Sequence, residues 1–341
     1  MRNKFLVILL LTIVTVGHAQ SIVTDVSKRG TSAAPFLLIG QGARATAMGS
    51  AFVAIADDPS SMYWNPAGLA SMEDGAVVFD HTNWISDVTY NYVAATYGLG
   101  GMGTIGVSFT SSSYGDMNVT TVDEPLGTGE IFSASDAVFS IGYGINLTDN
   151  FAIGFNPKFV HQSIWKMSAT AFAIDMGVKY RTPFEGIILA MSISNFGTKM
   201  QMTGNSNVVI YDSDPENSGN NGNIPANLQT DEWSLPLMFR VGLGYTAKFT
   251  EDHKLAIAVD ALHPSDNYES VNVGAEYSFS DVVFLRGGYK SLFLDDSEES
   301  FTLGIGLKQM LLGNVAVKFD YSYADFGRLE EIQKFSVGIT F

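Results

Sequence analysis

Apolar and polar residues alternate along much of this chain. Between Val271 and Phe279 every second side chain is apolar, and Asn, Gly, Glu and Ser fill the positions between them. The segments 301–308, 315–323 and 151–159 repeat the pattern. Successive side chains of a β-strand point to opposite faces, so each segment has one apolar face and one polar or small-residue face. The pattern therefore predicts β-strands and does not fit the period of a helix.

The alternation yields fourteen candidate strands, many of them about ten residues long. A tilted strand of roughly that length crosses a bilayer. An even number of strands lets an antiparallel sheet close into a barrel, and closure matters because each unpaired backbone group in lipid costs several kcal/mol. The predicted strands are 75–81, 88–98, 102–111, 134–146, 150–163, 170–181, 186–195, 236–249, 253–262, 269–279, 282–290, 300–310, 314–323 and 333–341.

The connections between these strands sort by length. Short turns alternate with longer links, which is typical of outer-membrane barrels, whose short turns lie in the periplasm. A soluble β-sandwich shares the alternation but has no reason to sort its loops, so an all-β transmembrane barrel is favoured. The short turns are 99–101, 147–149, 182–185, 250–252, 280–281 and 311–313, and the longer links are 112–133, 164–169, 196–235, 263–268, 291–299 and 324–332.

Two N-terminal segments lack the alternation. Residues 1–19 have a basic start, an apolar run and small residues at the end, which is the pattern of a secretory signal peptide. Residues 20–74 are rich in Gly, Ala and Asp, with short helical turns expected at Ala43–Met48 and Ser60–Tyr63. We therefore predict a signal peptide, a plug or hatch segment over 20–74 and a barrel over 75–341. This organisation predicts the outer membrane of a Gram-negative-type bacterium, reached after Sec export.

Composition narrows the classes of function. Of 341 residues, 46% are apolar and 16% charged, and 35 acidic residues outnumber 19 basic ones, for a net charge of −16. This balance disfavours nucleic acid as a partner, because binding to phosphates needs a basic face. The absence of cysteine excludes disulfides, zinc–thiolate sites and thiol catalysis. The histidines are scattered and no catalytic or phosphate-binding motif stands in a fitting context, so we predict no enzyme activity, no metal and no cofactor.

Ten charged side chains fall on the polar face of the predicted strands. A basic side chain facing lipid at mid-bilayer costs roughly 2–4 kcal/mol, so these groups are expected to face the lumen. Counting back from the tight turns places Arg240 opposite Asp260 and Glu276 diagonal to Arg286. Because both signs are interleaved, a buried network of ion pairs is favoured over a path for a substrate. The ten are Lys158, Asp175, Lys179, Arg240, Asp260, Glu276, Arg286, Lys308, Lys318 and Asp320.

The longest predicted external loop, 196–235, is too long for a bare connection and contains a strand-like patch at Asn207–Tyr211. Its acidic stretch Asp212–Glu216, like Asp295–Glu299 in another loop, does not follow the spacing of a calcium-binding EF-hand. Loops of this length are usually functional or mobile, so this one is the first choice for docking a partner. The candidate partner residues are Asp212, Asp214, Glu216, Asp231 and Trp233.

Three motifs lie close together before the first strand. They are G-A-R-A-T-A-M-G at 42–49, A-D-D-P-S-S at 56–61 and W-N-P-A-G-L at 64–69. With these motifs the sequence resembles the PorV/PorQ family of outer-membrane proteins, distant relatives of the FadL fatty-acid transporters. The strand rhythm and the terminal Phe extend the resemblance over nearly the whole mature chain. The candidate hatch residues are Gly42, Arg44, Met48, Gly49, Asp57, Asp58, Trp64, Asn65, Pro66 and Gly68.

The hatch residues also have a purely structural interpretation. Asn65 followed by Pro66 favours the start of a turn, and the glycines permit close approach of backbones. Arg44 and the pair Asp57–Asp58 supply opposite charges that would lock the hatch inside the barrel. On this interpretation the motifs seal and staple the pore.

The resemblance implies a fourteen-stranded FadL-like barrel without a catalytic role. The best understood member of the family serves type IX secretion. It receives cargo with a C-terminal sorting domain at the outer-membrane translocon and passes it to a surface-attachment complex. The implied partners are outer-membrane lipid, the translocon and cargo sorting domains, and the implied contact surfaces are the outer barrel surface and the external loops.

A second hypothesis is a FadL-like transporter of hydrophobic small molecules. Such a transporter needs an apolar pocket and a lateral opening, and Pro157 in the fifth predicted strand removes a ladder hydrogen bond that would otherwise close the wall. The predicted lumen is polar and lined by small residues, which argues against transport. A structural outer-membrane protein with neither cargo nor substrate is the third hypothesis.

Overall fold

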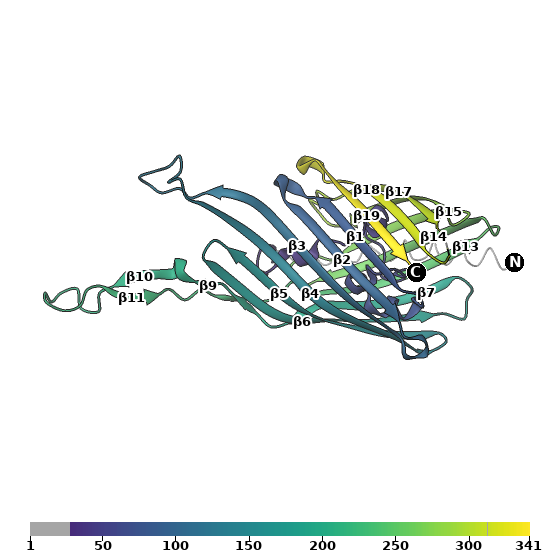
Figure 1. Ribbon diagram of the computed structural model, residues 1–341, viewed down its shortest axis with the longest axis horizontal. Helices are drawn as coiled ribbons and strands as arrows, with labels where there is room; N and C mark the ends of the chain where they lie inside the picture. Colours follow the sequence, from purple (N-terminus) through teal and green to yellow (C-terminus); the bar gives the residue numbers. More distant parts are fainter. Residues whose placement is uncertain (1–27, 312) are drawn as a thin grey trace.

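The computed structural model describes residues 28–311 and 313–341, so the signal peptide predicted over 1–19 lies outside the described residues. Within them, fourteen antiparallel strands form a closed barrel, which confirms the predicted fold (Figure 1). The first strand pairs with the last over its whole length, and this seam closes the sheet. The strands are β1 (Ala76–Asn83), β2 (Thr89–Gly98), β3 (Thr104–Asn118), β4 (Ile131–Thr148), β5 (Phe151–Ile164), β6 (Met167–Arg181), β7 (Ile187–Gly197), β13 (Met238–Lys248), β14 (His253–Pro264), β15 (Ser270–Phe279), β16 (Val283–Leu292), β17 (Phe301–Met310), β18 (Ala316–Asp325) and β19 (Glu331–Thr340).

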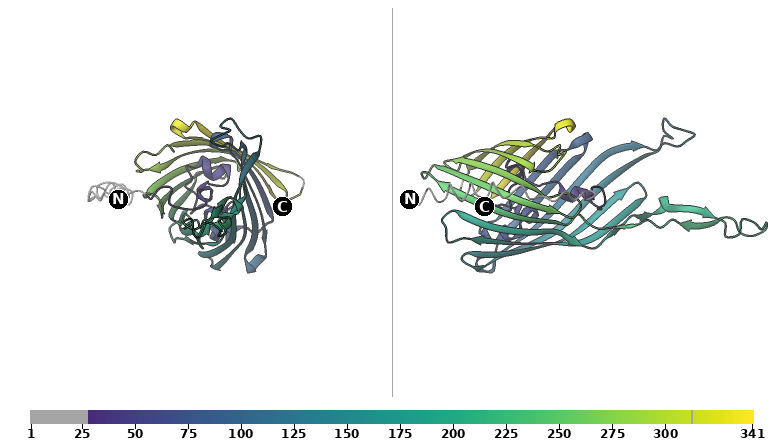
Figure 2. Two further views of the ribbon diagram at one scale, coloured as in Figure 1. Left: turned by 90° about the vertical axis from the view of Figure 1, so that its left-hand side faces the viewer. Right: turned by 180° about the vertical axis from the view of Figure 1, so that it is seen from behind.

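All fourteen predicted strands are present, but β3, β4, β5 and β6 are long, with 15, 18, 14 and 15 residues against ten in each of β15 to β19. Many of their extra residues are polar, such as 111–118 of β3. Pairing therefore continues where the apolar alternation stops, and the wall is taller on this side (Figures 1 and 2). The predicted link at 164–169 is wrong for this reason, because only Trp165 and Lys166 separate β5 from β6.

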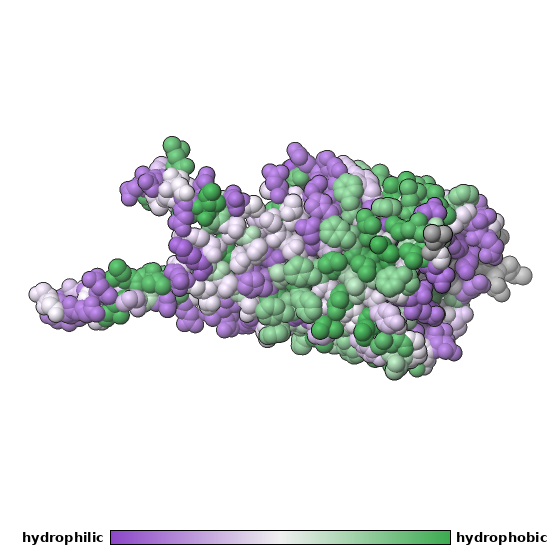
Figure 3. All heavy atoms as spheres, in the orientation of Figure 1, coloured by the Kyte–Doolittle hydropathy of each residue, from purple (hydrophilic) through white to green (hydrophobic). Residues whose placement is uncertain are grey.

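The outer face of the barrel is apolar and the inner face is polar. On β17, Leu303 and Leu307 are 54% and 50% exposed, whereas Thr302 on the inner face is 2% exposed. Apolar residues gather in a band over the barrel, with polar surface on either side of it (Figure 3). This is the surface expected of strands that cross lipid. None of the described helices has the length and apolarity needed to span a membrane.

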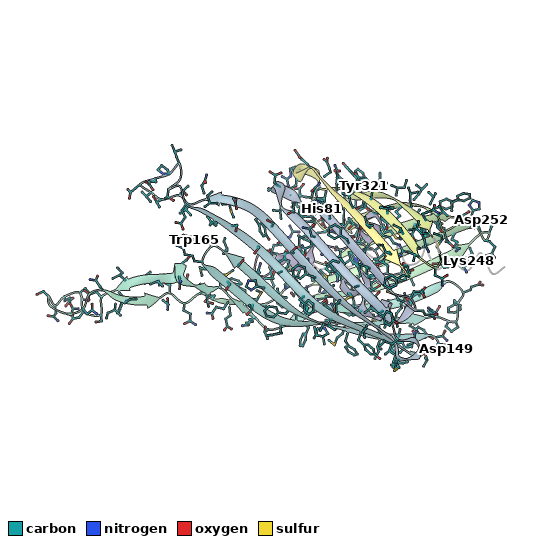
Figure 4. The ribbon with its side chains drawn as sticks, in the orientation of Figure 1. His81, Asp149, Trp165, Lys248, Asp252 and Tyr321 are labelled. Carbon is teal, nitrogen blue, oxygen red and sulfur yellow. The ribbon has the colours of Figure 1, made fainter. Side chains whose placement is uncertain are left out.

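The two ends of the barrel differ. Asp149, Lys248 and Asp252 lie at the end with the short turns, and Trp165 lies toward the other end (Figure 4). Because outer-membrane barrels keep short turns in the periplasm, we call these the periplasmic and external ends. Single helical turns lie in three of the connections, namely η3 (Ile85–Asp87), η4 (Gly100–Met102) and η6 (Gly327–Leu329).

The external connection between β7 and β13 has a structure of its own. It projects farther from the barrel than any other described segment (Figure 1). The strand-like patch predicted at 207–211 corresponds to its strand β10. The connection contains η5 (Asn205–Asn207), β8 (Met200–Gln201) paired with β12 (Glu232–Trp233), β9 (Thr203–Gly204) paired with β6, and β10 (Val208–Tyr211) paired with β11 (Ile224–Asn227).

Residues 28–75 fold inside the barrel as a plug (Figure 2). At its start, Arg29 donates a hydrogen bond of 2.7 Å to Asn267 in an external loop. At its end, Gly75 exchanges backbone hydrogen bonds with Phe341 at the periplasmic end. The plug therefore runs the length of the lumen. Its elements are η1 (Pro35–Leu38), α2 (Ala43–Ala47), α3 (Ser61–Trp64) and η2 (Pro66–Ser71), which include both predicted helical turns.

The apolar core lies inside the barrel and comes largely from the plug. Phe52 and Trp64 belong to one buried cluster that also includes a residue of β14. Phe36 and Leu37 pack with Tyr90 of β2 in a second cluster, which lies nearer the external end. The plug thus fills a lumen whose strands supply mainly small and polar side chains.

Glycines on the inner wall allow the plug backbone to lie directly on the sheet. A Cβ atom added to Gly288 of β16 would lie 2.2 Å from the backbone nitrogen of Gly49. A Cβ atom added to Gly154 of β5 would lie 2.2 Å from the carbonyl carbon of Pro66. Two of the three hatch motifs are therefore seated on wall positions that have no room for a side chain.

Pro157 does not open the wall as the transporter hypothesis expects. The pairing of β5 with β6 is continuous past Pro157, which lies opposite Ile174. On the β4 side the pairing lapses at Pro157 and its neighbour and then resumes in the same register. The proline thus interrupts one ladder over two positions and leaves the two strands adjacent.

Candidate functional site

Arg44 connects two parts of the plug to the barrel wall. Its Nη1 lies 2.5 Å from Asp57 Oδ1 and 3.4 Å from Asp58 Oδ2. Its Nε and Nη2 donate to the two carboxylate oxygens of Glu276 on β15, both at 2.9 Å. Burial by itself would lower the pKa of Arg44, but these three carboxylates raise it well above its ordinary value. The guanidinium is therefore a permanent charge that ties the hatch to the sheet.

The contact between Arg44 and Glu276 continues along the wall as a chain of ion pairs. Arg286 Nε lies 2.5 Å from Glu276 Oε2, and its Nη1 lies 2.7 Å from Asp320 Oδ1. Glu276 and Arg286 lie directly opposite each other and not diagonally as predicted. The difference arises because three residues, 280–282, separate the paired strands instead of the expected two.

Arg240 and Asp260 do not face each other, and this prediction was wrong. Arg240 on β13 lies opposite Leu262, and Asp260 on β14 lies opposite Gly242. The predicted turn 250–252 already pairs position 240 with 262, so the turn was placed correctly and the count from it was two residues short. The two charges are diagonal neighbours that form no ion pair, although the charge of Arg240 still acts on Asp260.

Two buried charges of the wall hold plug backbone rather than a partner charge. Asp260 Oδ2 accepts hydrogen bonds from the backbone nitrogens of Phe52 and Val53, at 2.7 and 3.0 Å. Lys179 Nζ on β6 donates to the carbonyl oxygen of Ala56 at 2.8 Å. The plug segment between these contacts is thus fixed to two parts of the barrel.

Lys158 and Asp175 form a second buried ion pair, with 2.7 Å between Nζ and Oδ1. Asp175 also accepts a hydrogen bond of 2.7 Å from the backbone nitrogen of Asn195, where the register of β6 and β7 shifts. The pair therefore stabilises a bulge in the wall.

The remaining predicted lumen charges lie toward the periplasmic end. Lys318 Nζ lies 3.6 Å from Asp320 Oδ2 at the end of the ion-pair chain. Lys308 lies opposite Lys318, and no carboxylate within the described residues is at ion-pair distance from it. The ten charges consequently do not form one network: several pair, two hold plug backbone, and Lys308 and Arg240 have no described carboxylate partner.

Asn65 determines the path of the W-N-P-A-G-L motif. Its Oδ1 accepts a hydrogen bond of 3.1 Å from the backbone nitrogen of Ala67. Its Nδ2 donates to the carbonyl oxygens of Val53 in the plug, at 3.0 Å, and Val178 on β6, at 3.1 Å. Pro66 follows at the first position of η2, where its missing N–H costs no hydrogen bond.

The other hatch residues are held by specific contacts or by burial. The backbone nitrogen of Gly49 donates to Thr302 Oγ1 at 2.8 Å, and Trp64 Nε1 donates to the carbonyl oxygen of Gln41 at 2.7 Å. Asp58 Oδ1 accepts a hydrogen bond of 2.9 Å from the backbone nitrogen of Ser60, just before α3. Gly42, Met48 and Gly68 are buried.

A cavity of about 280 Å³ lies between the plug and the external loops. Tyr63 and Trp64 line it from the plug, Arg240 lines it from β13, and residues of the loops 265–269 and 293–300 line its outer part. The Arg240 guanidinium carbon lies 5.7 and 5.6 Å from the centres of the two aromatic rings. Burial raises the pKa of Tyr63, and the nearby charge of Arg240 opposes this shift.

The predicted partner loop places the apolar strand β10 and the acidic tip beyond it far from the barrel (Figure 1). Ile210 and Tyr211 of β10 are 73% and 55% exposed. At the tip, Asp212 Oδ1 accepts hydrogen bonds from the backbone nitrogen of Asp214 and from Asn220 Nδ2, at 3.0 and 2.6 Å. The other three predicted partner residues, Glu216, Asp231 and Trp233, are exposed.

The sequence matches the family described as "Type IX secretion system protein PorV" over residues 23–262. This chain belongs to the PorV family. The match includes the three hatch motifs and the barrel as far as β14. A search of the curated proteins finds no match.

Solved structures similar to this PorV-family chain are FadL-type barrels. The toluene transporter TbuX of Ralstonia pickettii is 13% identical with a TM-score of 0.55, over 89% of this chain and 98% of that one. The toluene transporter TodX of Pseudomonas putida is 12% identical with a TM-score of 0.55, over 88% and 97%. A FadL homologue of Pseudomonas aeruginosa is 11% identical with a TM-score of 0.50, over 85% and 95%. These likenesses show a FadL-like fold, which with the family places the protein in the outer membrane.

Sequence reasoning missed several lumen charges of this PorV-family barrel, among them Asp136 on β4, which is 4% exposed. Lys334 on β19 is 2% exposed and donates to the carbonyl oxygen of Gly40 in the plug. Asp80 on the neighbouring β1 is 1% exposed. Both occupy inward positions of their strands, so the rule that found the other ten would have found them too. Among the described residues, no group of three His, Asp or Glu side chains is arranged to hold a metal ion.

Proposed function

We propose that this PorV-family barrel is an adaptor of type IX protein secretion and surface attachment. Its partners would be the outer-membrane translocon and cargo that carries a C-terminal sorting domain. The observation that carries the proposal is the projecting β10–β11 hairpin, which holds exposed apolar side chains on a strand flanked by an acidic tip. Loops this long and ordered are usually functional, and exposed apolar side chains mark contact surfaces.

The interior supports a docking role over a conduit. The plug runs the length of the lumen and is tied to the wall by Arg44, Asp260 and Asn65. A buried ion pair broken on one side costs about 3–5 kcal/mol, so displacing the plug would be expensive. An adaptor can work from its outer surface and its external end while its lumen stays closed.

Replacing residues 205–229 with a short Gly-Ser linker tests the proposal, because it removes the hairpin and keeps the pairing of β8 with β12. We expect the tagged hairpin variant, purified from native membranes, to capture neither the translocon nor the cargo. Shortening the other external loop, 119–130, is the control and should leave capture intact. The heat-modifiable gel mobility of folded barrels should be unchanged in both variants. Unchanged capture by the hairpin variant would remove the hairpin from the proposal.

Two point variants distinguish the contribution of the apolar strand β10 to partner binding from that of the acidic tip. Ile210→Asp places a charge on the most exposed apolar residue of β10, and Ser213→Asp adds the same charge at the tip. If the apolar strand makes the contact, only the first variant should lose its partners. Loss of the partners by both variants would assign the effect to the added charge.

The signal peptide is a separate part of the proposal. We expect Sec export with cleavage after Ala19, so N-terminal sequencing of the outer-membrane form should begin at Gln20. A mature protein that retains residues 1–19 would contradict this part alone.

A transporter of hydrophobic small molecules is the second candidate. The cavity at the external end and the fold shared with toluene transporters favour testing it. The adaptor proposal expects cells that carry this barrel to take up toluene no faster than cells without it. Saturable uptake that depends on the barrel would favour the transporter instead.

A further inference from the structure

We propose that the cavity beside Arg240 is a binding site for a small organic carboxylate with an apolar or aromatic body. Tyr63 and Trp64 of the plug line the cavity. It has a volume of about 280 Å³, close to the lower end of the range of roughly 300–1,000 Å³ typical of small-molecule pockets. The site is independent of the adaptor role and of any transport.

Arg240 is a buried cation that forms no ion pair with any described residue, although its charge acts on Asp260 of the neighbouring strand. The residue is 4% exposed, and no carboxylate in the described residues lies within ion-pair distance of it. Its Nη1 donates to Ser194 Oγ at 3.2 Å, whereas its Nε is buried and has no hydrogen-bond partner among residues 28–311 and 313–341. A buried charge left in this state is costly, and a carboxylate would relieve it through a charge-assisted hydrogen bond.

The other charges at the cavity already have polar partners. Lys290 forms an ion pair with Glu299, and Asp266 accepts a hydrogen bond of 2.6 Å from Ser32 Oγ. Arg29, which also lines the cavity, donates a hydrogen bond of 2.7 Å to Asn267 Oδ1. Arg240 is thus the buried positive charge that a ligand would meet. A monoanion matches it, whereas a doubly charged phosphate would bring a second charge into a poorly solvated site.

The rest of the cavity lining suits a ligand whose apolar part is small. Leu38, Met238 and Leu262 line the cavity, and the rings of Tyr63 and Trp64 lie beside the guanidinium. An aromatic ring or short aliphatic group fits these surfaces, but the volume is too small for a long acyl chain. The outer part of the cavity is formed by external loops, so the ligand would enter from outside the cell.

Benzoate is the probe, and benzamide is its neutral isostere. Calorimetry on the full-length mature protein in nanodiscs should show saturable benzoate binding and about tenfold or more weaker benzamide binding, because only the carboxylate answers the charge of Arg240. This comparison uses the unaltered protein and needs no variant to fold. Equal affinities for the two probes, or no saturable benzoate binding, would overturn the proposal.

Arg240→Gln localises the binding to this cavity. We expect it to reduce benzoate affinity about tenfold or more and to leave the weak benzamide affinity unchanged. Arg181→Gln, on an exposed arginine at the periplasmic end, is the matched control and should bind benzoate like the unaltered protein. Unchanged benzoate affinity in Arg240→Gln would overturn the assignment. Partner capture by the adaptor is a separate measurement, so either proposal can fail without the other.

Discussion

Toward the periplasmic end, plug backbone lies on wall glycines and the charges between plug and wall are paired, as Arg44 and Glu276 show. Toward the external end, side chains of the plug and wall meet around a cavity, and the guanidinium of Arg240 has no carboxylate partner within the described part of the chain. The first arrangement packs the plug directly against the wall. The second leaves a cavity and the charge of Arg240 available to a ligand. The periplasmic part of the lumen therefore seals the barrel, and the external part is suited to binding.

The largest expected effect comes from breaking the ion pairs between plug and wall toward the periplasmic end. Glu276→Gln removes a charge that faces both Arg44 and Arg286, and we expect the free energy of unfolding to fall by about 3–5 kcal/mol. Glu299→Gln is the control at the external level, where the pair with Lys290 is partly exposed and worth about 1 kcal/mol or less. Urea unfolding of the barrel in lipid vesicles measures both. Equal losses would show that the two levels do not differ.

A neighbouring pair of glycines tests the backbone contact. Gly288→Ala would place its Cβ 2.2 Å from Gly49 N, whereas Gly287 on the opposite face of the same strand has its nearest neighbouring atom 3.7 Å away. We expect Gly288→Ala to lower the free energy of unfolding by about 1–3 kcal/mol through overpacking. Gly287→Ala should change it by less than about 0.5 kcal/mol. The same unfolding assay applies, and two equal values would refute tight seating of the plug.

A smaller effect concerns an external ion pair. Hydrogen bonds from Arg328 hold the pKa of Glu298 below its ordinary value of 4.5. A lowered pKa means that the pair stabilises its loops above the ordinary value and that this contribution is lost as pH falls through the lowered one. Arg328→Gln should raise the pKa of Glu298 toward 4.5, measured by carboxyl NMR titration. An unchanged titration would show that the contact does not persist in solution.

For the last variant, which removes the β10–β11 hairpin, we expect no change in stability. β10 and β11 pair only with each other among the described strands, so replacing 205–229 should leave the free energy of barrel unfolding unchanged. Retained stability with lost partner capture would separate recognition from the fold. A large loss of stability would mean that the hairpin supports the barrel.

The membrane-spanning part of the fold was predictable from the sequence because lipid imposes alternation. All fourteen strands follow from it, but the polar extensions of β3 to β6 do not, since strands above the lipid need no apolar face. The register between strands was harder to predict from the sequence. One extra turn residue moved Arg286 from a position diagonal to Glu276 to the position directly opposite it. The alternation rule was therefore reliable for which face a residue takes and unreliable for which residue lies across from it.

The candidate site was predictable only in part. The hatch motifs pointed to Arg44 and Asn65, but their contacts with the wall depend on an irregular backbone that no periodicity describes. The cavity beside Arg240 could not be seen at all, because it depends on plug residues meeting loops more than two hundred positions later in the chain. Irregular segments carry chemistry that patterns of apolar residues do not reveal.

The position of the plug constrains the order of assembly. The segment occupies the lumen from one end to the other, and its last residue, Gly75, is bonded to Phe341 beside the seam between β1 and β19. A closed cylinder could not be threaded afterwards by a chain anchored in this way. We therefore expect the sheet to curl around a plug already in place, with the pairing of the first strand to the last as a late step of biogenesis.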